Sequence, residues 1–235
     1  MQSSDYLRVY VEPLQKILAS ALNSLGGKAS NGLDEAYKGY CSVLINRAAV
    51  GFLCLKNNEL DYSARMLIRP AMEAMFKLLA VKQEPSLLYR IARHEHEENE
   101  KWARPFAPCS KDVHDESFKM KWEDFKKEYQ QAFPTHPLTD SSIGLRSLAA
   151  KAKVDPYYDS HYRLYCQFTH ATLRASTDDL EDFSGEDERT VVATLIVAIE
   201  AVQDCGGLVE GFATLRDEFL AENKIGELVV APNGP

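Results

Sequence analysis

Four charged side chains recur at every fourth position within a largely apolar stretch, residues 61–82. They are Arg65, Arg69, Glu73 and Lys77. A four-residue step keeps side chains in line along a helix, and a helix that is apolar nearly all round is usually buried. The pattern therefore indicates an internal Arg–Glu pair that positions a catalytic group or a bound anion. The alternative is an ordinary salt bridge, with Arg65 and Lys77 extending their charged ends to water.

A second set of polar side chains lies within the tyrosine-rich stretch 157–176. Arg163, Gln167, His170 and Arg174 are spaced by four, three and four residues, which places them on one helix face. A histidine on such a face can transfer protons while the guanidinium groups bind phosphate. The alternative is that His170 packs in the core and bonds to a buried acid such as Glu73. We expect Arg69 and Glu73 to be buried, with Glu73 reaching His170 or Arg163 on the facing helix.

The stretch RHEHEENE, residues 93–100, offers pairs that are typical of metal ligands. His94 and Glu98 are one helical turn apart, and so are His96 and Glu100. The full ligand set of a di-iron bundle, with Glu-x-x-His on two helices, cannot be assembled around them. We interpret the stretch as a solvated face and assign no metal or other cofactor. The alternative is a metalloprotein that uses His94, Glu98 and their neighbours. Cys166, one turn before His170, is interpreted as a packing residue, because a thiol buried in a helix lacks an exposed electropositive setting.

These residues must be positioned by helices, since no convincing strand pattern appears in the chain. Apolar residues recur at steps of three and four in successive segments separated by Gly, Pro and Asn-rich turns. We predict an all-α fold: one domain, 1–235, forming a bundle of about seven helices with a buried central helix at 61–82. Residues 85–135 are expected to form a peripheral helical hairpin, and the last helix, 187–222, to be interrupted at Gly206-Gly207.

Composition and charge limit the partners. The 235 residues carry a formal net charge of −8, which argues against a broad electrostatic surface for nucleic acid or for an anionic membrane. Five scattered cysteines without a CxxC pair fit reduced thiols in the cytoplasm. No secretory signal is recognised at the N-terminus, and the apolar run 191–202 is too short to cross a bilayer. We expect a cytoplasmic protein that does not bind membranes.

The segment 190–202 is apolar around nearly its whole circumference, more than one neighbouring helix needs. Such a helix is either central to the core or part of a two-fold interface. We favour a homodimer.

Two stretches carry a resemblance to known proteins. ARMLIRPAMEAMFKLL and YRLYCQFTHA resemble the Arg-x-x-x-Glu helix and the Tyr…Ser/Cys…His helix of an uncharacterised family of bacterial helical proteins. This family is distantly similar to HEPN domains, which often dimerise and include metal-independent ribonucleases of toxin–antitoxin and phage-defence systems. The HEPN motif, an Arg followed after four to six residues by a His, is matched by Arg163-LYCQFT-His170.

Two functional hypotheses follow. In the first, which the resemblance implies, the chain is a HEPN-like endoribonuclease acting on RNA, with Arg163 holding the scissile phosphate and His170 moving a proton beside Arg69 and Glu73. In the second, it is a non-enzymatic helical module that binds or regulates a partner protein, and its Arg–Glu–His cluster is structural.

Overall fold

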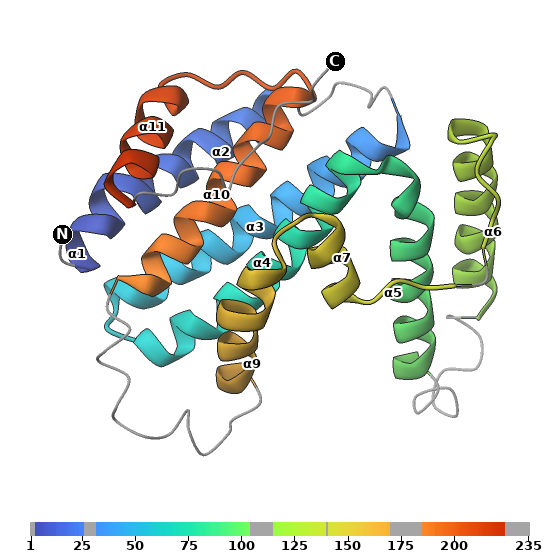
Figure 1. Cartoon of the computed structure of the whole chain (residues 1–235), viewed down its shortest axis with the longest axis horizontal. Helices are drawn as coiled ribbons and strands as arrows, with labels where there is room; N and C mark the ends of the chain where they lie inside the picture. Colours follow the sequence, from blue (N-terminus) through green and yellow to red (C-terminus); the bar gives the residue numbers. More distant parts are fainter. Residues whose placement is uncertain (1–2, 26–31, 104–114, 140, 170–184, 224–235) are drawn as a thin grey trace.

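The computed structural model describes residues 3–25, 32–103, 115–139, 141–169 and 185–223. These residues form helices and no strand, so the predicted all-α fold is confirmed (Figure 1). When π-helical and 3-10 turns are counted with the helices that they continue, nine helices are described, against about seven expected. None of the helices in the described ranges is long and apolar enough to cross a membrane.

The chain begins with one continuous helix and then a long antiparallel hairpin. α1 (Ser3–Tyr6) passes through the π-helical turn η1 (Leu7–Val11) into α2 (Glu12–Leu25). α3 (Leu33–Asn57) and α4 (Asp61–Gln83) form the hairpin. The two helices approach closely at Gly51, where an added Cβ would lie 2.6 Å from Cδ1 of Leu67. Any larger residue at this position would push α3 and α4 apart or displace that leucine.

Two helices form the centre of the bundle. α4 continues through Pro70, which is exposed, and buries Ile68, Met72 and Phe76 among others. α10 (Glu186–Asp204) packs against α2, α3 and α4, and 14 of its 19 residues are buried. The apolar circumference of the segment 190–202 is thus covered within one chain, so α10 belongs to the core. The homodimer stays a prediction, and it no longer derives support from this helix.

α11 (Phe212–Asn223) covers part of α2 after the predicted interruption. Gly206 adopts a positive φ of 80°, a conformation that favours glycine. At Gly207, an added Cβ would lie 2.5 Å from the side chain of Val202. The chain therefore turns tightly at the two glycines before α11 starts.

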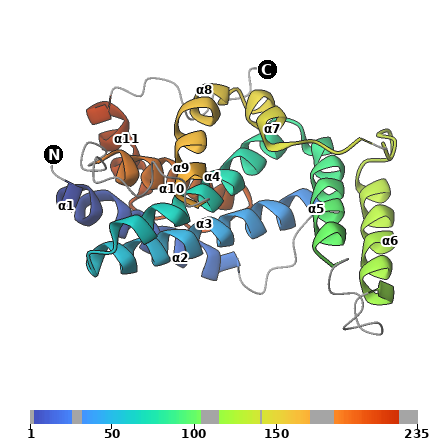
Figure 2. The ribbon, with the colours of Figure 1, turned by 90° about the horizontal axis from the view of Figure 1, so that it is seen from below.

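α5 (Leu88–Ala103), which the 3-10 turn η2 (Pro85–Leu87) precedes, and α6 (Asp115–Ala132) lie side by side at one end of the molecule (Figures 1 and 2). Aromatic rings join them: Tyr89 of α5 lies 5.6 Å from Trp122 and 5.1 Å from Tyr129, centroid to centroid. Trp122 and Tyr129 of α6 thus face α5 and hold the two helices together.

One more helical column packs on α4. α7 (Leu145–Lys151) leads to α8 (Asp155–Tyr157), the π-helical turn η4 (Tyr158–Tyr162) and α9 (Arg163–Thr169), of which the last three are continuous. Both α7 and α9 contact α4. This column carries the second set of sequence-predicted residues as far as Thr169. The last residues of the stretch 157–176, including His170 and Arg174, lie outside the described residues.

Candidate functional site

The four charged side chains predicted to form a line along α4 each have a partner in the molecule. Arg65 pairs with α10, Arg69 and Glu73 pair with each other, and Lys77 pairs with α5. The predicted line of charge is therefore present along α4. Its surroundings change from one end to the other, and this change decides what each residue can do.

The Arg65 end is enclosed. Nε of Arg65 donates to Oδ2 of Asp187 at 2.6 Å, and the two side chains are only 8% and 3% exposed. The hydroxyl of Tyr165 donates to the other oxygen of Asp187 at 3.0 Å. The guanidinium also lies 5.4 Å from the centre of the Phe168 ring, within range of a cation–π contact. The expectation that Arg65 extends its end to water is wrong.

Burial shapes the titration of this network. It raises the pKa of Asp187, although the hydrogen bond and charge of Arg65 oppose the shift. Burial, together with the charge of Asp187, also raises the pKa of Tyr165, so its hydroxyl stays protonated and donates. With water excluded and each of these three side chains engaged, the network fastens α4, α9 and α10 to one another.

The middle of the line is half-open. Nε of Arg69 donates to Oε1 of Glu73 at 3.0 Å, and the side chains are 24% and 32% exposed. The same Oε1 accepts the hydroxyl of Tyr162 at 2.7 Å. We expected both residues to be buried, with Glu73 reaching His170 or Arg163. The facing helical column is the expected one, but the partner is Tyr162, and His170 lies outside the described residues.

Tyr162 is fixed in its protonated form. Burial raises its pKa, and the hydrogen bond to Glu73 and that carboxylate's charge raise it further. A neutral phenol beside a carboxylate is a hydrogen-bond donor and not a nucleophile. Tyr162 therefore fastens the start of α9 to α4, directly before Arg163 in the chain.

The Lys77 end joins α3, α4 and α5. Nζ of Lys77 lies 2.6 Å from Oε1 of Glu95, which also accepts the hydroxyl of Tyr37 at 3.3 Å. Burial raises the pKa of the nearby Cys41 to about 12. The thiol is thus protonated near neutral pH and is not a nucleophile.

The outer side of the column α7–α9 is different, because its arginines face solvent. Arg163 is 69% exposed, and its nearest described carboxylate is Asp159, with 3.9 Å between Nη1 and Oδ1. Arg146 of α7 is 73% exposed and lies 3.7 Å from Oδ2 of the same aspartate. Contacts of this length are looser than a charge-assisted hydrogen bond of about 2.7–2.9 Å. Both guanidinium groups are therefore available to a ligand.

The sequence-predicted residues consequently divide into groups. Arg69 and Glu73 come together with Tyr162, whereas the described partner of Arg163 is Asp159. The contact expected between Glu73 and His170 lies outside the described residues. Sequence reasoning missed Asp187, Tyr162 and Arg146. Only Tyr162 had a usable signal, since it falls one turn before Cys166 in the stretch that carries the family resemblance.

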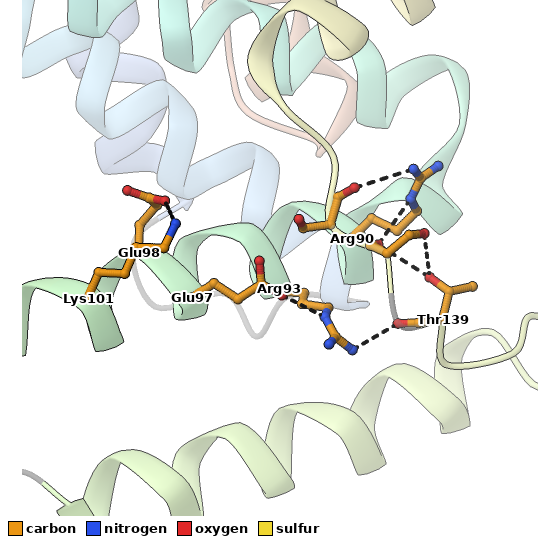
Figure 3. Close-up of polar contacts among 8 residues, drawn as sticks. Arg90, Arg93, Glu97, Glu98, Lys101 and Thr139 are labelled. Atoms are coloured by element: carbon orange, nitrogen blue, oxygen red, sulfur yellow. Dashed lines mark hydrogen bonds and ion pairs between the residues drawn. The ribbon is translucent and has the colours of Figure 1, made fainter.

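The polar face of α5 is occupied by ion pairs and by bonds to a neighbouring segment (Figure 3). Glu98 forms an ion pair with Lys101 at 2.6 Å. Arg93 binds Glu97 and the carbonyl of Thr139, and Arg90 donates to the carbonyls of Ser141 and Ser142. Within the described ranges, no group of three or more His, Cys, Asp or Glu side chains is arranged to hold a metal ion.

Residues 36–188, well over half of the chain, match the model of a family of unknown function (DUF5677). The matched region runs from α3 to the start of α10 and includes the charged line of α4, the column α7–α9 and Asp187. No curated protein and no solved structure matches the chain.

Proposed function

The chain belongs to this family of unknown function, DUF5677, and we propose that it is a HEPN-like, metal-independent endoribonuclease of a defence or toxin–antitoxin system. Arg163 holds the scissile phosphate in this proposal, and His170 moves a proton. The proposal rests on the resemblance of Arg163-LYCQFT-His170 to the HEPN motif and on the surroundings of Arg163.

The observation that carries the proposal is the exposure of Arg163. Its side chain is 69% exposed and only loosely paired with Asp159, so binding a phosphate would break no buried interaction. A guanidinium presents several N–H donors in a planar fork that fits phosphate oxygens. Aimed at a phosphate, it also stabilises negative charge that develops during cleavage. An imidazole is the side chain best suited to transfer a proton near neutral pH.

Arg69 and Glu73 take a positioning role in this proposal instead of a catalytic one. Both Arg69 and the Tyr162 hydroxyl bind the same oxygen of Glu73. Because Tyr162 directly precedes Arg163, this cluster holds the backbone that carries the phosphate-binding arginine. A shift of this backbone would move the guanidinium relative to the phosphate, and small misplacements are costly in catalysis.

The test is cleavage of a labelled single-stranded RNA at low salt in the presence of a chelator. We expect cleavage by the parent, loss of cleavage in Arg163→Gln and in His170→Asn, and unchanged cleavage in Arg47→Gln. Arg47 is an exposed arginine of α3, so its substitution changes the net charge by the same amount at a distant place. A parent that is inactive at low salt, with and without added metals, would refute the proposal. Cleavage that survives both the Arg163 and His170 substitutions would also refute it.

The second candidate is a non-enzymatic helical module that binds or regulates a partner protein. It is favoured by one observation: Arg65, Arg69, Glu73 and Lys77 all engage partners inside the molecule. An inactive parent, combined with strong destabilisation by His170→Ala, would support the module. The proposed homodimer is tested separately by light scattering, and a monomer at high micromolar concentration would contradict it.

A further inference from the structure

Two exposed arginines from different helices share one carboxylate on the outer side of the column α7–α9. Arg146 of α7 approaches Oδ2 of Asp159 at 3.7 Å, and Arg163 of α9 approaches Oδ1 at 3.9 Å. Asp159 lies in the π-helical turn between α8 and α9 and is itself 45% exposed. Each carboxylate oxygen thus faces one guanidinium, and the arginines lie on either side of the aspartate.

The charges of this group do not balance. Two guanidinium groups face one carboxylate, which leaves one positive charge in excess. The wider segment 145–163 has four Lys or Arg residues against two Asp, within a chain of net charge −8. One of these cations, Lys151, is paired with Glu84 at the C-terminal end of α4, whereas the ion pairs of both arginines with described residues are the long contacts to Asp159. Arg146 and Arg163, which share the single carboxylate of Asp159, therefore contribute to a local excess of positive charge.

Exposed ion pairs of this kind hold weakly. Such pairs contribute little to stability because solvent screens them, and the two contacts here are longer than a charge-assisted hydrogen bond. A phosphate can replace the aspartate at either guanidinium and gain a bidentate contact. Asp159 then acts as a competitor that occupies both arginines until an anion arrives.

We propose that Arg146 is a second phosphate-binding residue, which holds a neighbouring phosphate of the same single RNA strand that Arg163 engages, and that Asp159 competes with the RNA for both arginines. This inference rests on the proposed function and names a further residue and the form of its substrate. A single strand suits the site, because its flexible backbone can place two phosphates on either side of the aspartate. Sequence-tolerant binding to single strands likewise relies on charge along the backbone.

The experiment measures binding separately from cleavage. A fluorescent single-stranded RNA with 2′-O-methyl groups cannot supply the attacking 2′-hydroxyl, and its anisotropy reports affinity for the full chain over a range of salt concentrations. We expect Arg146→Gln to weaken binding about tenfold, as expected for the loss of one charged hydrogen bond. It should also reduce the slope of log K against log salt by about 0.7, the value for one phosphate contact with a single strand.

Two controls sharpen the result. Arg47→Gln on α3 removes the same charge elsewhere and should leave both affinity and slope near those of the parent. Asp159→Asn removes the competing carboxylate and should tighten binding, in contrast to a variant that merely disturbs the fold. Circular dichroism of each variant confirms that the helices persist.

These binding measurements distinguish a failure of the two-arginine site from a failure of the proposed ribonuclease function. Equal affinities of Arg146→Gln and Arg47→Gln, or no tightening in Asp159→Asn, would overturn the inference even if the parent cleaves RNA. A parent that does not bind the RNA would overturn it as well. A parent that binds as expected but never cleaves would refute the ribonuclease while supporting the two-arginine site. Duplex RNA that binds as tightly as the single strand would overturn the assignment of a single-stranded substrate.

Discussion

Arg65 and Arg163 are both paired with an aspartate, yet they lie in opposite environments. The Arg65–Asp187 contact is 2.6 Å long and almost fully enclosed between α4 and α10. The Arg163–Asp159 contact is 3.9 Å long, and the arginine side chain is 69% exposed. In the first region, Tyr165 binds the remaining oxygen of Asp187. In the second, the remaining oxygen of Asp159 faces another exposed arginine, Arg146.

The comparison teaches that burial, more than residue type or partner, separates a structural arginine from one that can bind a ligand. A buried pair must keep both of its members, because either one alone would be an uncompensated charge in the core. An exposed pair can dissociate at little cost. Arg69 and Glu73 lie between these limits, half-exposed and joined to Tyr162.

The largest loss of stability is expected when the buried pair, Arg65–Asp187, is disrupted. Asp187→Ala leaves the guanidinium of Arg65 without its carboxylate, and removing one partner of a buried pair costs about 3–5 kcal/mol. The matched control is Asp159→Ala, which removes the aspartate of the exposed pair and should change the free energy of unfolding by less than about 0.5 kcal/mol. Urea unfolding of both variants measures the difference. Similar losses in the two proteins would show that burial does not separate the two regions.

The fold was largely predictable because helix periodicity is a local property of sequence. The four-residue spacing of Arg65, Arg69, Glu73 and Lys77 correctly predicted a line of charged residues along one helix, α4, in which each has a partner. The predicted break at Gly206-Gly207 is also present. It was predictable because a pair of glycines is a local signal for a turn, and Gly206 does adopt a positive φ. Spacing could not show which end of the charged line is buried, and the environment expected for Arg65 was wrong.

The partners of these residues were harder to predict because they come from distant segments. Asp187 is 122 positions from Arg65 and stands in the strongly acidic stretch TDDLEDFSGEDE, where an acidic side chain is usually solvated. It is instead 3% exposed, because the first turn of α10 packs beside α4 and α9. Arg146 was missed for a similar reason: only the three-dimensional fold brings α7 to the turn that carries Asp159.

An intermediate loss of stability is expected at the half-exposed cluster of Arg69, Glu73 and Tyr162. Tyr162→Phe removes the hydroxyl that binds Glu73 but leaves Arg69 paired with that carboxylate, so the loss should be about 1 kcal/mol, typical of one hydrogen bond. If this contact positions Arg163, RNA cleavage should also slow, though less than in Arg163→Gln. A Tyr162→Phe protein that is less stable than Asp187→Ala would contradict the expectation that the loss of stability increases with the burial of the pair.

The most direct test of the central claim is chemical unfolding of Arg163→Gln beside Arg65→Gln. Both variants lose one guanidinium and one formal charge, so they differ mainly in the environment of the arginine. We expect the Arg163→Gln curve to superimpose on that of the parent, while Arg65→Gln, which leaves Asp187 buried without its guanidinium, loses several kcal/mol, about 3–5. An Arg163→Gln protein destabilised as strongly as Arg65→Gln would contradict the account, because Arg163 would then be a structural residue.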